Sequence, residues 1–219
     1  MNLVIFDCDG TLVDSAAAIV STMETAFLSQ GQTPPTPTAV RNAIGLSLEV
    51  CISRLTEDVD LVPAIAQAYR DTFNANGQAS AHGLFSGAMP AILDLAKRDN
   101  YLLGIATGKS RRGLDALLEH HQLTTHFQTT KTADDAPSKP HPGMIEMCMK
   151  EAGVGPQETL VIGDTTYDME MATAAGAVGM GVSWGSHDAM TLLAAGAHSV
   201  VFDFPRLVPA VDSYFSERS

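Results

Sequence analysis

The chain has 219 residues, of which 45% are hydrophobic and 17% are charged, and its formal net charge at pH 7 is −12. This composition is typical of a globular chain that buries a core and excludes an intrinsically disordered protein. No apolar run reaches the roughly 18 to 20 residues that a membrane span requires, so we expect no membrane partner. The acidic charge argues against nucleic acid as a partner, because non-specific nucleic-acid binding depends on a basic surface.

Three cysteines, Cys8, Cys51 and Cys148, are scattered along the chain without metal-ligand spacing. An odd number of separated thiols favours reduced cysteines and a cytoplasmic protein. The first seven residues lack the basic start of a signal peptide, and we expect none. For the oligomeric state we expect a monomer or a weak homodimer.

Short apolar runs alternate with helical patterns along the chain. The runs at residues 3–6, 101–106, 159–162, 178–182 and 198–202 are typical of strands buried on both faces. Amphipathic patterns at residues 89–96 and 114–121 predict helices between them. The alternation predicts an α/β fold whose parallel sheet is covered by helices on both faces, with functional sites at the carboxyl ends of its strands.

Residues 15–83 interrupt this alternation, because they show helical spacing only. Apolar residues recur at helical intervals in residues 19–27, 40–55 and 61–73, which predicts three helices, and the Pro-rich residues 33–38 separate the first two. A purely helical segment between the first strand and the rest of an α/β domain looks inserted. We therefore expect an α/β core of residues 1–14 and 84–219 and a helical cap domain of residues 15–83.

Two carboxylates, Asp7 and Asp9, directly follow the first predicted strand and precede Gly10. Acids this close repel each other unless a cation binds or one of them takes up a proton, and a hard divalent cation such as Mg²⁺ resolves the repulsion. Gly10 permits a sharp turn that leaves backbone amides free to face a phosphate. Taken alone, the pair is equally compatible with an Asx-turn that ends the strand. An EF-hand loop is excluded, because its required Gly and Glu positions hold Leu12 and Ala18.

Thr107 and Gly108 follow the next predicted strand and open a helix. A hydroxyl, a bare backbone amide and a helix N-terminus together form an anion site. The following Lys109 and Ser110 suggest a P-loop, but that motif needs a glycine five residues before Gly108, where Leu103 stands. An ordinary helix cap is the alternative for this segment.

Lys139 precedes the proline-flanked start of another predicted helix. The neighbouring prolines stiffen the backbone and would hold the ammonium group in one direction. A lysine in such a position is more often a solvated surface residue, so this feature alone decides nothing.

Asp164 stands at the carboxyl end of the strand predicted at residues 159–162, and Asp168 lies one helical turn further on. Capping of the next helix explains such acids when they are considered alone. However, the acidic pair, the hydroxyl, the lysine and this second acidic pair each follow a strand or open a helix. All four can meet at one edge of the sheet, and we interpret them as one site.

These motifs resemble those of the haloacid dehalogenase-like hydrolase superfamily, and in particular of its phosphoglycolate phosphatase-like and β-phosphoglucomutase-like members. The resemblance covers almost the whole chain and implies a Rossmann-like parallel sheet core with a small inserted α-helical cap domain. Asp9 distinguishes the chain from the true dehalogenases, which lack that second acid. The matching motifs, in chain order, are Asp7-x-Asp9-Gly10-Thr11, Thr107, Lys139 and Gly163-Asp164-x-x-x-Asp168.

The resemblance also implies how the reaction would proceed. Asp7 would be the nucleophile that forms an aspartyl-phosphate. Asp9 would protonate the leaving alkoxide and then activate the water that cleaves the intermediate. The cofactor would be Mg²⁺, held by the Asp7 carboxylate, the Asp9 carbonyl and Asp164. Asp168 would support these ligands without binding the ion itself.

Substrate binding follows from the same resemblance. Thr107, the Gly108 amide and Lys139 would hold the phosphoryl oxygens where charge accumulates in the transition state, with the turn at Gly10 facing the phosphate. Arg41, in the predicted cap, is a candidate contact for a carboxylate or a second anion of the substrate.

The leading hypothesis is a Mg²⁺-dependent phosphatase, a phosphoric monoester hydrolase, that acts on a small phosphorylated metabolite similar to phosphoglycolate or a sugar phosphate. Two alternatives remain open. One is a phosphomutase that returns the phosphoryl group to a sugar, and the other is a non-catalytic regulatory protein that has the same fold.

Overall fold

The computed structural model describes residues 1–75 and 83–218. Its centre is a six-stranded sheet in the order β3-β2-β1-β4-β5-β6, in which every pair of neighbouring strands is parallel. The α/β prediction is therefore confirmed. The strands are β1 (Asn2–Phe6), β2 (Tyr101–Ala106), β3 (Thr129–Lys131), β4 (Thr159–Gly163), β5 (Val178–Val182) and β6 (Ser199–Val201).

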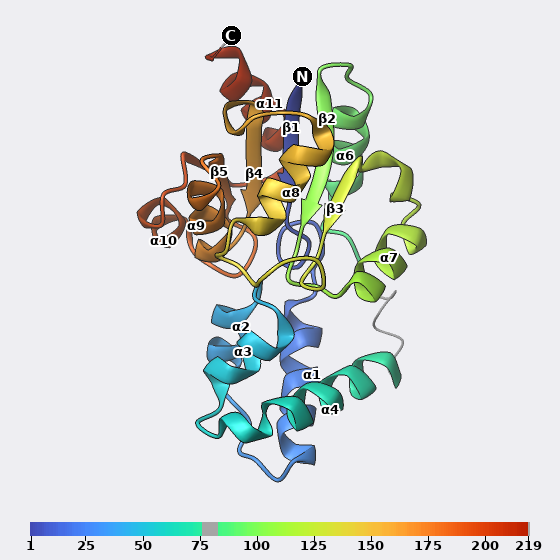
Figure 1. The fold of residues 1–219 in the computed structure, drawn as a ribbon, viewed down its shortest axis with the longest axis vertical. Helices are drawn as coiled ribbons and strands as arrows, with labels where there is room; N and C mark the ends of the chain where they lie inside the picture. The colour runs from blue at the N-terminus through green and yellow to red at the C-terminus, as the bar shows by residue number, and fades with distance from the viewer. Residues whose placement is uncertain (76–82, 219) are drawn as a thin grey trace.

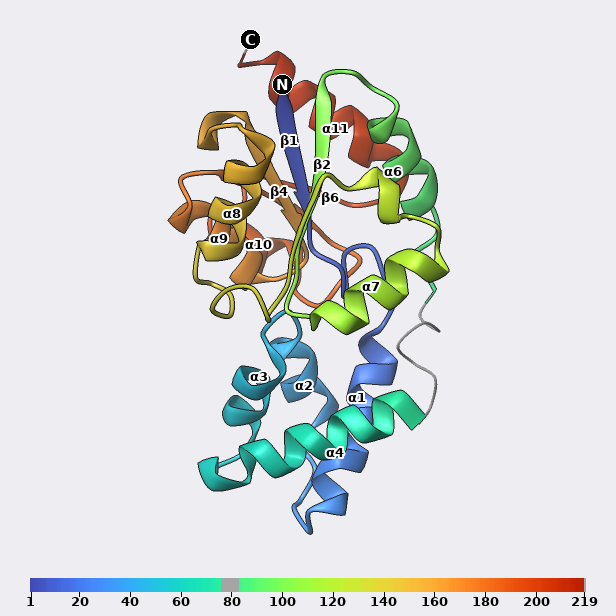
Figure 2. The same cartoon turned by 45° about the vertical axis from the view of Figure 1, so that its right-hand side comes forward.

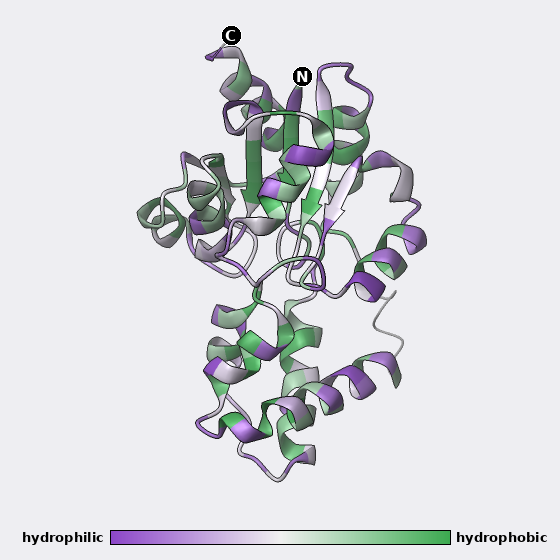
Figure 3. Ribbon diagram, viewed as in Figure 1, coloured by the Kyte–Doolittle hydropathy of each residue, from purple (hydrophilic) through white to green (hydrophobic). Residues whose placement is uncertain are grey.

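Helices cover both faces of the sheet (Figures 1 and 2). Val4 and Phe6 of β1 point into a core that they share with one set of helices, and Leu3 and Ile5 point into the core of the opposite face. This alternation explains why β1 reads as a continuous apolar run; it is green in Figure 3, as is β4. The first set is α6 (Ala88–Ala96), α7 (Arg111–His120) and α11 (Phe204–Ser216); the second is α8 (Gly143–Ala152) and α9 (Thr166–Ala174). A further helix, α10 (Ala189–Ala194), lies against β5 and β6.

Four helices lie beyond the carboxyl ends of the strands, away from both chain termini (Figure 1). We call them the helical block: α1 (Ala16–Ser29), α2 (Pro37–Ala43), α3 (Leu48–Leu55) and α4 (Val62–Ala75). They enclose an apolar core of their own that includes Met23, Phe27, Ile52 and Ile65. A separate core is what a cap domain requires, but the predicted division at residues 15–83 stays a prediction, and its residues 76–82 lie outside the described part of the chain.

The described chain segments on either side of the helical block lie next to each other. Val13 forms an antiparallel bridge with Leu84, and the backbone N–H of Asp14 donates to the carbonyl of Gly83 at 3.1 Å. The chain thus leaves the sheet layer and re-enters it at neighbouring points.

Two elements differ from the sequence-based expectation. The segment 40–55, predicted as one helix, is two helices, because Gly45 between them adopts φ +97°, a left-handed conformation that interrupts a helix. Strand β3 was not predicted. Its three residues, Thr-Thr-Lys, carry no apolar signal, and only its pairing with β2 makes it a strand.

Within the described residues, no helix combines the length and the apolar character needed to cross a membrane.

Burial predicts which leucines stabilise the fold. Leu95 of α6 is fully buried, so Leu95→Ala should lower the free energy of unfolding by about 2–5 kcal/mol, through lost apolar transfer and the cavity left behind. Leu28 of α1 is 57% exposed, and Leu28→Ala should change it by less than about 0.5 kcal/mol. Urea denaturation of both variants measures the difference, and equal losses would contradict the assigned core.

Candidate active site

The register of the sheet brings three of the predicted motifs to one level. Phe6 at the end of β1 pairs with Ile105 of β2 and with Ile162 of β4. The three strands therefore end at the same edge of the sheet. Asp7 directly follows Phe6, and Thr107 and Asp164 stand two residues after the partners of Phe6 in β2 and β4. The backbone N–H of Asp7 donates to the Ile162 carbonyl at 2.9 Å, which holds Asp7 against β4.

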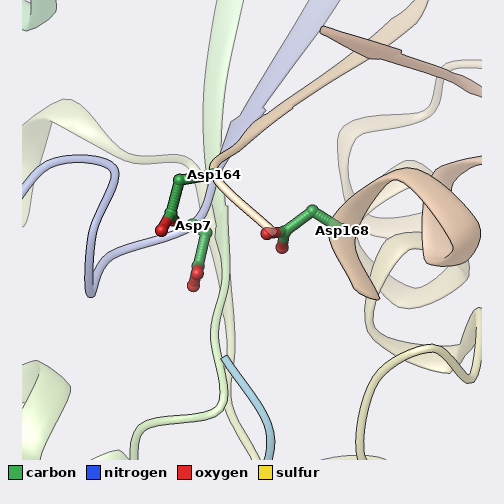
Figure 4. A group of neighbouring side chains, drawn as sticks. All are labelled: Asp7, Asp164 and Asp168. Carbon is green, nitrogen blue, oxygen red and sulfur yellow. The ribbon is translucent and has the colours of Figure 1, made fainter. Parts of the chain in front are cut away.

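Three carboxyl groups converge at this edge. One oxygen each of Asp7, Asp164 and Asp168 lies within 4.8 Å of the others, and all three side chains are buried. Figure 4 shows Asp7 and Asp164 pointing the same way below the strand ends, while Asp168 points towards them from the start of α9. This convergence depends on Gly10, which has φ +87°: a Cβ atom there would lie 2.1 Å from an Asp164 carboxylate oxygen.

Hydrogen bonds hold Asp164 and Asp168 in place. Asp164 accepts from the Thr11 hydroxyl and from the backbone N–H of Ser186, both at 2.8 Å. Asp168 accepts with one oxygen from the backbone N–H and the hydroxyl of Thr165, in a capping box that begins α9. Asp168 therefore has both roles: it caps α9, and it belongs to the acidic cluster.

Lys139 is not a surface lysine. The residue is only 2% exposed, and its ammonium nitrogen lies 2.6 Å from an Asp168 oxygen and 2.8 Å from Asp7 Oδ1. Burial by itself would lower the pKa of Lys139, but the ion pairs with Asp168 and Asp7 raise it above its ordinary value. Lys139 therefore stays charged and partly neutralises three buried acids.

The cluster fits a divalent cation. Apart from the ion pair with Lys139, neither carboxylate oxygen of Asp7 has a hydrogen-bond partner among the described residues, although the side chain is 1% exposed. Burial raises the pKa of Asp7 to about 8 against the opposing effect of Lys139, and burial and the neighbouring Asp168 raise the pKa of Asp164 to about 6. Unsatisfied, closely spaced carboxylate oxygens are the donors that Mg²⁺ prefers.

Asp9 points to a different set of partners. Its Oδ1 accepts from the Ser15 hydroxyl at 2.7 Å and lies 2.9 Å from the Lys109 ammonium nitrogen. Sequence reasoning missed both partners. The one signal in the sequence is the position of Lys109, two residues after Thr107 on the same loop.

Thr107 and Gly108 form the loop that faces the helical block. Thr107 is buried directly after β2, and a Cβ atom on Gly108 would lie 2.5 Å from the carbonyl oxygens of Gly45 and Leu46. Only a glycine at position 108 allows this approach of the two chain segments. The helical block therefore touches the predicted anion loop directly.

A cavity of about 230 Å³ lies between the sheet edge and the helical block. Asp7, Asp9, Thr107 and Gly108 line its sheet side together with Lys109, while Lys139 and Asp164 are buried beside Asp7. Arg41 is exposed in the last turn of α2 and is not among the lining residues. The structure thus brings the predicted motif residues together and leaves Arg41 outside.

Comparison with known proteins extends these observations. Residues 4–182 match the family described as haloacid dehalogenase-like hydrolase. A protein of Dickeya dadantii named "Probable phosphatase IndB" is 37% identical over 213 residues, which cover 95% of this chain and 92% of the relative. A phosphoglycolate phosphatase of Pseudomonas putida is 28% identical and is matched over 95% of this chain and 79% of its own length.

Among solved structures, a hydrolase from Pseudomonas syringae superposes with a TM-score of 0.86 at 27% identity, over 97% of this chain and 99% of that one. The similarity therefore includes the helical block as well as the sheet. The enzyme class expected from the motifs, a phosphatase, agrees with these relatives. With the family model spanning most of the chain and the motif residues converging at one sheet edge, this protein belongs to the haloacid dehalogenase-like hydrolase family.

Proposed function

We propose that the protein is a Mg²⁺-dependent phosphatase that hydrolyses a small phosphorylated metabolite through an aspartyl-phosphate on Asp7. The observation that carries this proposal is the Asp7 carboxylate: it borders the cavity, is buried, and has Lys139 as its one polar side-chain partner among the described residues. The names of the relatives support it, since they include a phosphoglycolate phosphatase. Compounds of the size of phosphoglycolate or a sugar phosphate are the first substrates to test.

The metal would be held by the Asp7 carboxylate, the backbone carbonyl of Asp9 and Asp164. When bound, Mg²⁺ would neutralise the repulsion between the anionic nucleophile and the anionic ester. Asp168 has one oxygen on Lys139 and the other on Thr165, so it would position the lysine rather than bind the ion. The structure therefore suits Asp168 to a supporting role.

In the first half of the reaction, a carboxylate oxygen of Asp7 would bond to phosphorus as the bond between phosphorus and the ester oxygen breaks. Asp9 would donate a proton to the departing alkoxide. Lys139, the Thr107 hydroxyl and the Gly108 N–H would hold the phosphoryl oxygens, where negative charge accumulates.

In the second half, Asp9 would take a proton from a water whose oxygen attacks phosphorus. The bond between phosphorus and Asp7 then breaks, and inorganic phosphate leaves. In this structure Asp9 Oδ1 accepts from the Ser15 hydroxyl at 2.7 Å and lies 2.9 Å from the Lys109 ammonium nitrogen. Proton transfer through this oxygen would require these two contacts to open.

Replacement of the nucleophile should abolish turnover without unfolding the protein. Asp7→Asn keeps the side-chain shape but removes the attacking oxygen anion, so phosphate release should fall by about 10³-fold or more. The matched control is Asp14→Asn, the same change at an exposed position of the same segment, which should retain activity. Thermal unfolding checks that both variants are folded, and substantial activity in Asp7→Asn would overturn the nucleophile assignment.

Removal of the general acid and base should have a smaller effect. Asp9→Asn retains the nucleophile and the metal ligands but cannot transfer a proton, so kcat should fall by roughly 10²–10⁴-fold. An aryl phosphate with a good leaving group needs less protonation in the first step. The rate of that step should therefore fall less for this substrate in Asp9→Asn. Formation of the aspartyl-phosphate can then be compared for aryl and alkyl esters in single-turnover measurements, and equal losses for both would contradict the role of Asp9 as acid.

Mg²⁺ binding should weaken as the pH falls, because the ion needs an ionised Asp7 and burial raises the pKa of that carboxyl to about 8 in the metal-free protein. Below this pKa, binding must displace a proton, so the apparent affinity should drop by up to about tenfold per pH unit. Trp184 donates from Nε1 to the Thr11 carbonyl at 3.0 Å, which makes its fluorescence a suitable readout for Mg²⁺ titrations. An affinity that does not change between about pH 6 and pH 9 would contradict the raised pKa of Asp7 in the metal-free protein.

A further inference from the structure

The two walls of the cavity differ in character. The sheet wall carries the acids, the anion loop and Lys109, whereas the wall formed by the helical block is mainly apolar. Ile19 and Met23 of α1, Leu46, and Tyr69 and Phe73 of α4 line it. The rings of Tyr69 and Phe73 stack with their centroids 5.8 Å apart and their planes 17° apart. In Figure 2, α4 lies across α1 beneath α7, which places this apolar wall opposite the anion loop.

Charge on the helical wall is already paired. Among the described lining residues of this wall, the one cation is Arg70, and it forms an ion pair with Glu49. Burial raises the pKa of Tyr69 above its ordinary value, so the phenol stays neutral. A carboxylate on the substrate would therefore meet Glu49 and apolar side chains here, and no unpaired cation among the described residues of this wall.

Two cations, Lys109 and Arg112, line the sheet side of the cavity. Lys109 is paired with Asp9, and its ammonium nitrogen lies 6.0 Å from the centre of the Phe73 ring. Arg112 of α7 also lines the cavity, and its side chain is exposed. Both cations belong to the sheet side of the cavity, whereas the apolar side chains belong to the helical block.

The cavity is also larger than a phosphoryl group needs. It measures about 230 Å³, whereas one ordered water requires only about 10–15 Å³ of such space. With the phosphoryl group held at Asp7, the leaving alcohol would extend towards the helical wall. Apolar surface that a ligand covers is removed from water, which contributes binding energy in proportion to its area.

We infer that the preferred substrate is a phosphate monoester whose leaving alcohol carries an uncharged apolar group, alkyl or aromatic, that packs against the helical wall. This inference rests on the proposed function and narrows its substrate class. In the overall reaction, the bond between phosphorus and the alcohol oxygen breaks. The oxygen of water ends on inorganic phosphate, and a proton from water ends on the released alcohol.

The test compares ethyl, butyl and hexyl phosphate, together with 2-phenylethyl phosphate, against phosphoglycolate. The n-alkyl esters have leaving groups of similar basicity, so differences in kcat/KM report contacts with the apolar part. Burial of methylene groups predicts a rise of up to about fourfold per methylene until the cavity is filled. We expect hexyl phosphate to exceed ethyl phosphate by about tenfold or more, and 2-phenylethyl phosphate to exceed phosphoglycolate.

Phe73→Ala tests the wall itself. It should lower the ratio of kcat/KM for hexyl over ethyl phosphate by about threefold or more, because part of the apolar surface is lost. A loss that is uniform across the esters would instead reflect the contact between Phe73 and Lys109 and would count against the inference. The matched control, Phe202→Ala, makes the same change at a position that is 60% exposed and outside the cavity, and should leave the ratio unchanged.

The outcomes separate the two proposals. Phosphate release from phosphoglycolate that is faster than from 2-phenylethyl phosphate, with no gain from ethyl to hexyl phosphate, would overturn the apolar class and leave the phosphatase proposal intact. No release from any ester, including aryl phosphates, in the presence of Mg²⁺ would overturn both.

Discussion

The candidate site depends on one buried cation among buried acids. Lys139 contacts both Asp7 and Asp168, and Asp164 lies within the same cluster. Removing one partner of a buried ion pair typically costs about 3–5 kcal/mol, because the remaining charge is left uncompensated. One ammonium for three carboxyl groups still leaves an excess of negative charge. Burial, together with the neighbouring Asp168 and Asp164, raises the pKa of Asp7. The excess of negative charge makes the site suitable for a divalent cation.

The parallel sheet makes this concentration of charge possible. Because β1, β2 and β4 end at one level, residues separated by more than 150 positions in sequence can share a site: Thr11 donates its hydroxyl hydrogen to Asp164. Glycines then allow the approach. A side chain on Gly10 or Gly185 would collide with Asp164, and one on Gly163 would collide with Asp168. The sheet brings the acidic residues to one edge, and the glycines, which have no side chain, leave room for them.

The helical block is packed separately from the sheet layer. It has its own apolar core, and it contacts the sheet layer through short backbone approaches and a few polar bonds. Gly45 and Leu46 lie against Gly108, the Ser47 N–H donates to the Ser138 hydroxyl at 2.9 Å, and the Tyr167 hydroxyl donates to the Asn42 carbonyl at 2.8 Å. An element that is packed internally and joined by few contacts can shape the cavity without altering the reacting groups. In the proposed enzyme, the chemistry and the choice of leaving group therefore belong to different parts of the chain.

Much of this protein could be predicted from the amino-acid sequence alone. Strands buried on both faces read as apolar runs, and residues that follow such strands must lie at one sheet edge, so Asp7, Thr107 and Asp164 could be assigned to one site. Only the tertiary structure decided the features that depend on neighbours distant in sequence. Strand β3 exists through its pairing with β2, buried Lys139 pairs with two buried acids, and Lys109 pairs with Asp9, 100 positions away in sequence. Burial and charge pairing belong to the folded arrangement, and for that reason no local pattern revealed the apolar wall or placed Arg41 outside the cavity.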